Sequence, residues 1–368
     1  TYILSSMKYL NSVIKSTGCY LPKSVIKNAE FVGRSFLNAS GIPLSKPASE
    51  IVQKLQDITQ IKERRYEESH DTSFMATQAA LNAFENSGIE VESLGGIIIA
   101  HNFGNIGPDG TQGHMIPNLA AKVKHDLGIK NARCFAFDVL YGCPGWLLAM
   151  NQAHQSIQLG AAKSVLVIGV ESLSRVVDHH DVDAMLFGDG AGAAVLVAEE
   201  SNVKRGILGY DAFSDCGEEV DYLRMDAPRY PATEDTVQVD HDRLVIQMTG
   251  RSVFKYAVNK VPQIITESLQ SLNIPFKDIS KFLFHQANGK MLDAIGQKLC
   301  ELNNAPCIKE KVPLTLNELG NTSVATIPTM IDLINRGKID GFEFSSGEKV
   351  VMASVGAGMH ANCLVYQY

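Results

Sequence analysis

Hydrophobic and polar residues form two alternating kinds of segment along this chain. Short runs rich in Val, Ile, Leu and Phe, typical of buried β-strands, lie at residues 95–101, 134–139, 164–172, 192–199, 282–286, 349–356 and 361–367. Between several of them are longer segments with helical spacing of apolar residues, such as 73–88 and 252–272. Strands that alternate with helices predict an α/β fold with largely parallel sheets.

One layout occurs twice along the chain. In 85–105 and again in 269–289, the end of a helix is followed by a short acidic turn, an apolar strand, a histidine and an asparagine. The glycine-containing strands at 189–199 and 355–367 then follow in the same order. Two matches in one order predict an internal duplication, with an N-terminal half at 7–200 and a C-terminal half at 201–368.

Composition and charge limit the class of protein. The chain has 368 residues, of which 45% are hydrophobic and 20% charged, so it is long enough to bury a large core. A formal charge of −7 argues against general nucleic-acid binding. We find neither a run long enough to span a membrane nor a signal-peptide pattern, and therefore expect a cytoplasmic protein. The seven cysteines show no CxxC spacing, so we expect neither disulfides nor a metal site.

Two segments interrupt the alternation of strands and helices. Residues 33–56 mix turn residues with a helical tail, and residues 216–242 are acidic, contain two prolines and lack a core pattern. We expect both to be excursions on the surface. Segments of this length in a compact domain are often functional covers rather than simple connectors.

Cys143 lies in the stretch "FDVLYGCPGWLLAMNQAHQSI", between a strand-like run and a helix-like run. Pro144 suits the first turn of a helix, and the run to Gly160 predicts that helix, so the thiol is expected at its N-terminal end. There the helix dipole favours an anion and would lower the thiol pKa, which makes Cys143 a candidate nucleophile. The alternative is that Cys143, like many free cysteines, is a small buried hydrophobic residue.

Two further polar residues occupy places where α/β proteins carry their chemistry. His285 ends the strand in "FLFHQANGK", and such strand ends face the crevice that binds ligands. Asn321 lies in a Gly-Asn-Thr turn before a helix. Position alone also allows a structural role for each, as a hydrogen-bonded core histidine and as a turn former or helix cap.

Two other motifs carry less chemistry. The glycines of "FGDGAG" at 187–192 lack the spacing of a phosphate-binding loop. The pair His179 and His180, flanked by aspartates, favours a solvated loop over a metal site.

The segments "DVLYGCPGW", "FGDGAGAAVL", "HQANGKM", "GNTSVATIP" and "VGAGM", in this order, closely resemble the β-ketoacyl-[acyl-carrier-protein] synthase III family of the thiolase superfamily. The likeness runs from residue 16 to the C-terminus. It implies an α/β fold of the duplicated thiolase type, five-layered αβαβα, and a homodimer. It also implies decarboxylative condensation of an acyl thioester with malonyl-acyl carrier protein to give a 3-oxoacyl product, which initiates fatty-acid synthesis without a bound cofactor.

The resemblance implies a role for particular residues. Cys143 would carry the acyl group, while His285 and Asn321 would hold the enolate oxygen that forms when malonyl thioester loses carbon dioxide. Backbone N–H groups of Cys143 and Ala357 would form the oxyanion hole. A thiolase would have a second cysteine where this chain has Ser354, so decarboxylation is favoured. The tunnel for pantetheine and substrate would be lined by Arg175, Phe187, Met248, Gly250, Phe254, Ala287, Asn288 and Ile116.

Several residues depart from the family's pattern or bear on its partners. Lys54 replaces a tryptophan that stacks on the adenine of coenzyme A, whereas Arg175 matches the family's stacking arginine. Adenine stacking would be weakened, which leaves open a carrier protein rather than coenzyme A as the carrier of the donated acyl group. Ile116 replaces a phenylalanine that closes the acyl pocket across the dimer, which predicts acceptance of more than acetyl groups. An acidic carrier protein would need a local basic surface on this acidic chain, and the candidates for it are Arg251, Lys255, Lys290 and Lys298.

Other functions stay open at this point. A related condensing enzyme could serve a specialised pathway, such as polyketide, aryl-polyene or alkyl-resorcinol formation, or head-to-head acyl condensation. A protein of another class, a non-catalytic subunit that binds acyl chains for a partner synthase, would be expected to lack the nucleophile.

Overall fold

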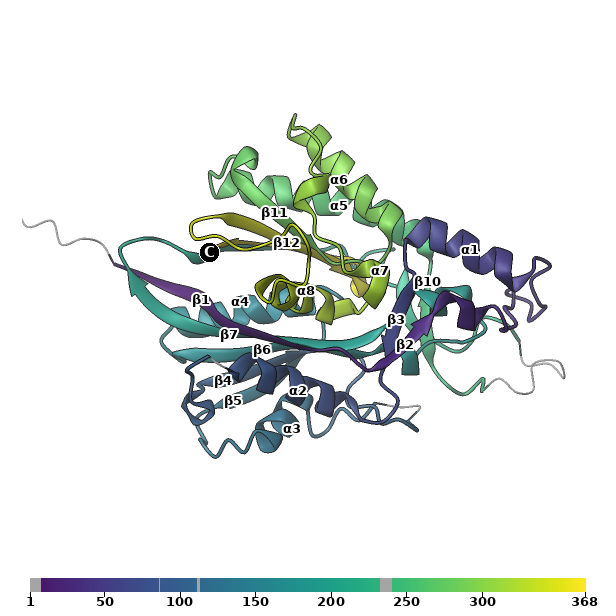
Figure 1. Ribbon diagram of the computed structural model, residues 1–368, viewed down its shortest axis with the longest axis horizontal. Coiled ribbons are helices and arrows are strands. Elements are labelled where there is room, and N and C mark those ends of the chain that lie inside the picture. The colour runs from purple at the N-terminus through teal and green to yellow at the C-terminus, as the bar shows by residue number, and fades with distance from the viewer. Residues whose placement is uncertain (1–7, 86, 111–112, 232–239) are drawn as a thin grey trace, which may run out of the picture.

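Two β-sheets and three layers of helices alternate in the computed structural model, which describes residues 8–85, 87–110, 113–231 and 240–368 (Figure 1). Helices α2 (Thr72–Phe84) and α3 (Leu119–Asp126) cover the outer face of the first sheet. Helices α4 (Gly145–Gln158) and α8 (Thr326–Asn335) lie between the sheets, and α5 (Gly250–Ser271) and α6 (Gly289–Leu302) cover the second. This is the five-layered αβαβα arrangement of the thiolase fold.

The two sheets repeat one strand order, in which β1, β7, β6 and β4 of the first sheet correspond to β8, β13, β12 and β11 of the second. The first sheet has the order β1-β7-β6-β4-β5, with bounds Tyr9–Tyr20, Asp189–Ser201, Ser164–Ser172, Gly96–Ala100 and Phe135–Val139. The second has the order β11-β12-β13-β8, with bounds Ile279–Phe284, Lys349–Gly356, His360–Gln367 and Gly206–Ser214.

Strand directions match as well. β4 and β6 are parallel, whereas β6–β7 and β7–β1 are antiparallel. β11–β12, β12–β13 and β13–β8 show the same succession of directions. The internal repeat expected from the sequence is therefore present in the fold, while the division at residue 200 stays our proposal. The first sheet has one strand more, β5, which lies beyond β4.

In the two large sheets the apolar runs predicted seven of the nine described strands and missed the other two. β1 and β8 lie at sheet edges, where several of their residues stay partly exposed. Polar residues are therefore tolerated along them, and neither strand forms a continuous apolar run.

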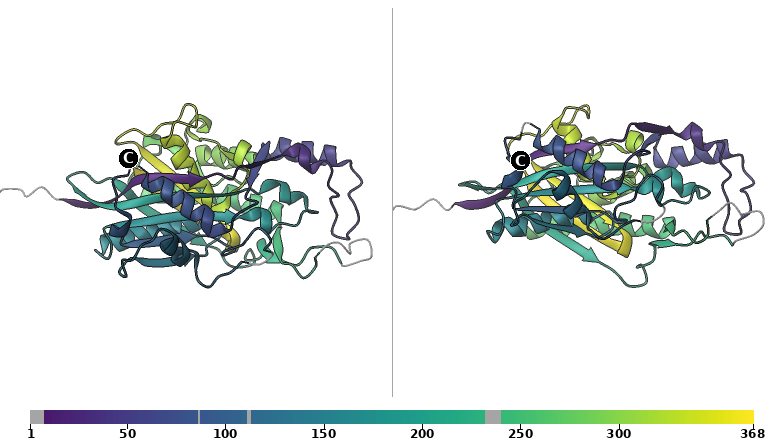
Figure 2. Two further views of the ribbon diagram at one scale, coloured as in Figure 1. Left: turned by 60° about the horizontal axis from the view of Figure 1, so that its bottom comes forward. Right: turned by 90° about the horizontal axis from the view of Figure 1, so that it is seen from below.

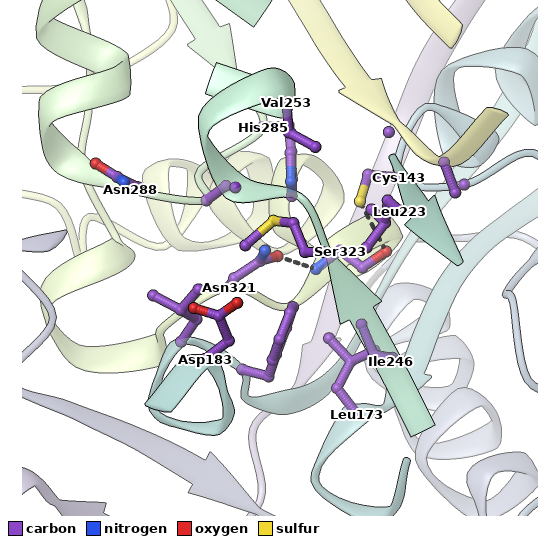
Figure 3. Close-up of a pocket in the computed structure, with 18 of the residues that line it drawn as sticks. Cys143, Leu173, Asp183, Leu223, Ile246, Val253, His285, Asn288, Asn321 and Ser323 are labelled. Atoms are coloured by element: carbon purple, nitrogen blue, oxygen red, sulfur yellow. Dashed lines mark hydrogen bonds between the residues drawn. The ribbon is translucent and has the colours of Figure 1, made fainter. Parts of the chain in front are cut away.

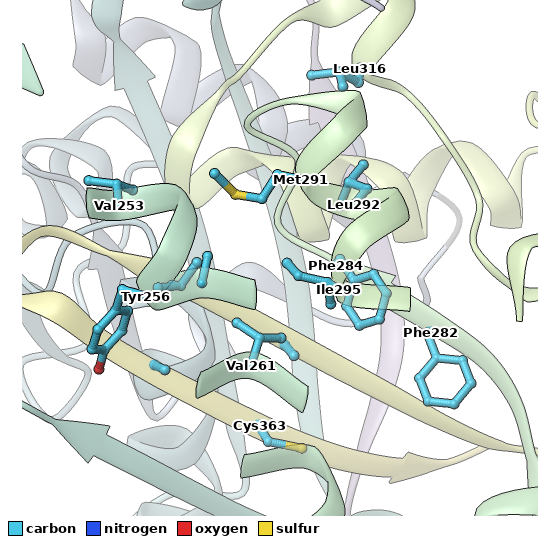
Figure 4. Close-up of a cluster of buried hydrophobic side chains, with 14 of the residues drawn as sticks. Val253, Tyr256, Val261, Phe282, Phe284, Met291, Leu292, Ile295, Leu316 and Cys363 are labelled. Carbon is cyan, nitrogen blue, oxygen red and sulfur yellow. The ribbon is translucent and has the colours of Figure 1, made fainter. Parts of the chain in front are cut away.

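An apolar cluster beneath α5 and α6 fixes the ends of these helices that border the site (Figure 4). Val253, Tyr256 and Val261 of α5, Ile295 of α6, and Phe282 and Phe284 of β11 belong to this one buried cluster. Each such side chain contributes about 1.5–3 kcal/mol when it is fully buried. Both helices begin beside the cavity described below, so this packing sets the position of its wall.

The two interrupting segments contain regular structure, which corrects the expectation that they are only surface excursions. Residues 33–56 include most of α1 (Ala48–Thr59), and Phe36 and Val52 are buried there against Phe31 and Met185. Residues 216–242 include β9 (Leu223–Asp226), which pairs with β10 (Val245–Met248). Residues 232–239 of this segment lie outside the described part.

Both segments lie at one end of the molecule. The views of Figures 1 and 2 place α1 at the end opposite the C-terminus, and β10 lies beside it. The remaining regular elements are β2 (Ser24–Lys27), β3 (Glu63–Tyr66) and the short helix α7 (Leu316–Leu319). In the described ranges we find no helix with the length and apolar character to cross a membrane.

Candidate active site

A cavity of about 440 Å³ brings Cys143, His285 and Asn321 together (Figure 3). Most of the predicted tunnel residues line it too, namely Phe187, Met248, Gly250, Phe254, Ala287 and Asn288, together with Ala357 of the predicted oxyanion hole. Its wall is largely apolar, with Leu173, Leu186, Leu223, Ile246 and Met291 among the lining side chains. The cavity therefore suits a flexible hydrocarbon chain that ends near polar groups.

Cys143 lies in the loop that connects the first sheet with the helical layer between the two sheets. It follows β5 and precedes Pro144, the N-cap residue of α4. The N-terminal N–H groups of α4 thus lie next to the thiol, as the sequence predicted. The Ser323 hydroxyl donates a hydrogen bond to Cys143 Sγ at 3.3 Å.

The expected low pKa of Cys143 is wrong for the empty site. Burial raises the pKa of its thiol to about 12, and the nearby carboxyl group of Glu171 acts in the same direction, while the Ser323 hydrogen bond opposes them. Desolvation thus penalises the thiolate more than the hydrogen bonds from Ser323 and from the Cys143 backbone favour it. The resting nucleophile is therefore a neutral thiol.

His285 directly follows the last residue of β11 and lines the cavity. Its backbone N–H donates to Ala353 O of β12 at 2.9 Å, which fixes the residue at the end of the sheet. Burial lowers the pKa of the imidazole to about 4. At neutral pH the ring is uncharged and retains one N–H donor.

Asn321 is held by its own turn. Its Oδ1 accepts the Ser323 N–H at 2.9 Å, and its backbone N–H donates to Leu186 O at 2.8 Å. The turn-forming role considered for this asparagine is thus present. It coexists with a place on the cavity wall, where the Nδ2 group can donate to a ligand.

Two glycines let loops from the two sheets meet at the nucleophile. A Cβ on Gly356, after β12, would lie 2.5 Å from Cys143 N, and a Cβ on Gly142 would lie 2.7 Å from Ala357 N. Because both glycines lack a side chain, the backbones of Cys143 and Ala357 approach closely. This is the arrangement that two backbone N–H donors of an oxyanion hole require.

Arg175 does not line the cavity, which corrects its predicted place in the tunnel. Its side chain is buried, and its guanidinium donates to the backbone oxygens of Ile106 at 2.6 Å, Glu67 at 2.5 Å and His70 at 2.6 Å. The guanidinium thus donates hydrogen bonds to three backbone carbonyl groups of nearby loops. Arg175 is therefore unavailable for stacking on adenine in this structure.

Ile116 also lies away from the cavity of its own chain. Its side chain is 90% exposed, before Pro117 and near the free edge of the first sheet. A contact across a dimer, as the resemblance implies, stays a prediction.

The predicted docking residues lie on the two helices that start beside the cavity. Arg251 and Lys255 on α5 and Lys290 on α6 are exposed, and in the described part of the chain none of them forms an ion pair. Lys298 is farther along α6 and pairs with Glu301 at 3.4 Å. Three of the four cations are thus free near the cavity.

The sequence did not reveal several residues at the site. Ser323, Asn102, and the apolar side chains of Leu55, Ile58, Leu223 and Met225 all line the cavity. Glu171 lies behind it and was marked only by being an acid at the end of the apolar run "SVLVIGVES". The apolar residues had no signal because their segments lacked a core pattern.

The histidine pair near residue 180 is tied to the loop before α1. His179 Nδ1 lies 3.0 Å from an Arg34 guanidinium nitrogen, and His180 Nδ1 lies 2.9 Å from Ser35 O. Among the residues the structure describes, no group of three or more His, Cys, Asp or Glu side chains could hold a metal ion.

A cysteine at a helix start, with an imidazole and an amide in an apolar cavity, defines a cysteine-dependent acyl-transferring enzyme of the thiolase fold. Comparison with known proteins agrees with this class. Residues 137–216 match the family model for 3-oxoacyl-[acyl-carrier-protein (ACP)] synthase III, and residues 269–368 match the model for its C-terminal part.

Individual relatives cover nearly the whole chain. The β-ketoacyl-[acyl-carrier-protein] synthase III of Brucella anthropi is 34% identical over 356 residues, which are 95% of this chain and 97% of that protein. The crystal structure of the Aquifex aeolicus 3-oxoacyl-[acyl-carrier-protein] synthase III aligns with a TM-score of 0.76 at 30% identity, covering 97% and 100% of the two chains. The chain belongs to the β-ketoacyl-[acyl-carrier-protein] synthase III family.

A third relative comes from a different metabolic setting. The crystal structure of a priming β-ketosynthase from a polyketide biosynthetic pathway aligns with a TM-score of 0.76 at 25% identity. It covers 97% of this chain and 96% of that one.

Proposed function

We propose that this enzyme condenses an acyl thioester with malonyl-acyl carrier protein, releasing carbon dioxide and giving 3-oxoacyl-acyl carrier protein, the first condensation of fatty-acid synthesis. The observation that carries the proposal is the meeting of Cys143, His285 and Asn321 in one largely apolar cavity. A subunit that merely bound acyl chains would need no nucleophile there.

The first half-reaction is acyl transfer to the enzyme. Cys143 Sγ attacks the thioester carbonyl carbon of the donor, and the donor's thiol leaves with a proton. The oxyanion formed during this attack is held by the backbone N–H groups of Cys143 and Ala357. Because the resting thiol is neutral, it must lose its proton as the donor reacts.

The second half-reaction uses the other two residues. Malonyl thioester loses carbon dioxide, and the enolate oxygen that results accepts hydrogen bonds from the neutral imidazole of His285 and from Asn321 Nδ2. The enolate carbon then attacks the acyl carbonyl, and the Cys143 thiolate is expelled. A neutral imidazole suits this role because a donor is needed rather than a base.

The donor and the acceptor enter as part of the same proposal. The acceptor is an acidic carrier protein, which the free cations Arg251, Lys255 and Lys290 would attract to the cavity entrance. The donor is a coenzyme A or carrier-protein thioester. With Lys54 in place of tryptophan and Arg175 buried, adenine stacking has little support here, which favours the carrier protein as donor.

Assembly and location complete the proposal. A homodimer is supported by the free edge of β5, where Phe137 and the following Leu140 are 38% and 54% exposed. Asn118, two residues after Ile116, contacts Ala136 O of this strand. The cytoplasmic location expected from the sequence stays a prediction.

The test is intact-mass spectrometry of the enzyme incubated with acetyl, hexanoyl and octanoyl thioesters of coenzyme A and of acyl carrier protein. We expect one acyl group on the enzyme, and its loss when malonyl-acyl carrier protein is added. An enzyme that gains no acyl group from any donor would contradict the proposal.

A second candidate is the same condensation in a polyketide pathway, favoured by the likeness to the priming β-ketosynthase and by the size of the cavity. The two candidates differ in the carrier protein used. Paired carrier proteins from fatty-acid and polyketide systems, compared as malonyl donors at equal concentration, separate them.

A further inference from the structure

Glu171 is a buried acid beside the nucleophile that the two half-reactions above leave without a role. It lies near the end of β6, a strand that is buried along its whole length. Alternate residues of a strand face the same side, and Val165 and Val167 pack toward the helices between the sheets. Glu171 therefore points into this central layer, and the whole residue is 1% exposed.

Hydrogen bonds connect this carboxyl group with the thiol. Asn102 Nδ2 donates to Glu171 Oε1 at 2.5 Å and to Ser323 Oγ at 3.4 Å. The Ser323 hydroxyl in turn donates to Cys143 Sγ at 3.3 Å. Asn102, Ser323 and Cys143 line the cavity, whereas Glu171 lies behind them. Residues from three other segments of the chain are thus connected to the sulfur atom, with Ser323 in direct contact.

The surroundings of Glu171 disfavour a charge. In the described part of the protein, no Lys, Arg or His forms an ion pair with its carboxyl group. Burial raises the pKa of Glu171 to about 8, and the carboxyl of Asp189 on β7 adds to this, while hydrogen bonds from Asn102 and Ser323 oppose it. The other titratable groups nearby are Cys143 before α4 and His285 after β11. A buried acid without a cation is costly to ionise.

The charge state of Glu171 affects the sulfur atom because the Cys143 sulfur and the Glu171 carboxylate can both accept the hydroxyl proton of Ser323. Ser323 has a single hydroxyl proton, which it donates to the thiol, and the Glu171 carboxyl lies close enough to interact with the same hydroxyl. An ionised carboxylate would compete for that proton, and as a like charge it would also raise the pKa of the thiol. A neutral carboxyl group leaves the proton for the sulfur.

We propose that Glu171 is a positioning residue for the nucleophile: its neutral carboxyl group anchors Asn102 and Ser323 so that Ser323 supports the Cys143 thiolate, and its ionisation opposes that thiolate. The inference rests on the proposed function in one respect, that Cys143 is the residue that becomes acylated. It adds a control on when this residue reacts.

The test compares Glu171→Gln, which keeps an oxygen acceptor for Asn102 but cannot ionise, with Glu171→Ala, which removes the acceptor. The rate of Cys143 alkylation by iodoacetamide is followed by peptide mass spectrometry from pH 6 to 10. Because the thiol pKa lies above this range, the rate rises throughout it, and we expect Glu171→Gln to be alkylated about tenfold faster than wild type at pH 10 and no faster at pH 6. Glu67→Gln, at a buried acid without contact to the thiol, is the matched control and should leave the rates unchanged.

Acyl uptake provides the second measurement. Glu171→Gln should acylate at the wild-type rate at pH 7, and Glu171→Ala at least about tenfold more slowly. Equal alkylation rates at pH 10 for wild type and Glu171→Gln would overturn the inference, even if the alanine variant failed to fold. A wild type that takes no acyl group would instead contradict the proposed function, and the alkylation profile would still test Glu171.

Discussion

Cys143 and His285 are both uncharged in the empty site, because the same apolar surroundings raise one pKa and lower the other. The resting pair is thus not a thiolate–imidazolium ion pair. The thiol therefore has to lose its proton as the acyl donor reacts.

Replacing Cys143 by Ala should abolish both covalent acylation and condensation, a loss on the order of 10³-fold or more in turnover. Intact-mass spectrometry and a condensation assay measure the two effects. Cys307→Ala, at an exposed cysteine, is the control and should behave as wild type. An alanine variant at position 143 that still bound one acyl group covalently would refute the assignment.

His285→Ala and Asn321→Ala should leave acylation nearly intact and slow malonyl decarboxylation by about 10²-fold or more, since each removes a donor to the enolate oxygen. The wild-type decarboxylation rate should be flat from pH 5.5 to 8, because the lowered pKa of His285 means that the ring gains its proton only as the pH falls toward about 4. An inflection near 6.5 would show that the imidazole titrates normally.

The elements α1 and β9 form part of the cavity wall, although the parts of the sequence that contain them show little apolar pattern. Met225 of β9 and Leu55 of α1 both line it. Filling this space should shorten the chains that fit: Met225→Trp is expected to reduce acylation by octanoyl thioester at least about tenfold while sparing acetyl transfer. Val220→Trp, at a partly exposed position of the same segment, is the control. Equal chain-length profiles would place the acyl group elsewhere.

The loops that meet at the nucleophile tolerate no side chain on Gly356. Gly356→Ala would place a Cβ 2.5 Å from Cys143 N, so the loop must shift and the oxyanion hole must open. We expect acylation to fall by about 10²-fold or more, the scale at which one oxyanion donor is lost. Gly33→Ala meets no atom within 4 Å and should acylate normally. A Gly356→Ala enzyme with wild-type kinetics would show that these N–H groups are not used.

At the scale of the whole molecule, an acidic protein has to attract an acidic carrier protein. Lys255→Glu combined with Lys290→Glu should raise KM for malonyl-acyl carrier protein severalfold, with less effect on acylation from a small coenzyme A thioester. Salt should weaken the wild type more than the double variant, because exposed charges are screened over about 10 Å at 0.1 M.

Lys277→Glu with Lys338→Glu changes the charge equally as a control. Lys277 precedes β11 and Lys338 follows α8, so both lie at the ends of these elements remote from the cavity. If the two double variants had the same KM for the carrier protein, docking would depend on net charge rather than on the helices beside the site.

The sequence was informative where a residue's role depends on its near neighbours. Pro144 and the apolar run after it predicted the helix start at Cys143, and β-branched runs predicted β4, β6 and β12. Prediction from the sequence failed where a residue's environment depends on segments that are distant along the chain. The pKa of Cys143 depends on burial by several loops, and the guanidinium of Arg175 is bound by carbonyls of Glu67, His70 and Ile106, whose positions no local pattern reveals.

The repeated sheets place two histidines at equivalent strand ends, but the two side chains have different surroundings. After β4, His101 is buried, its Nδ1 accepts from Gly104 N–H at 3.0 Å and its Nε2 lies 2.8 Å from Asp138. After β11, His285 borders the cavity. Asp138 comes from β5, the strand that the second sheet does not match, and that strand also leads to Cys143. The unmatched strand thus engages the first imidazole with a carboxylate and leads to the thiol, so two similar halves build one asymmetric active site, in which His285 rather than His101 can reach a ligand.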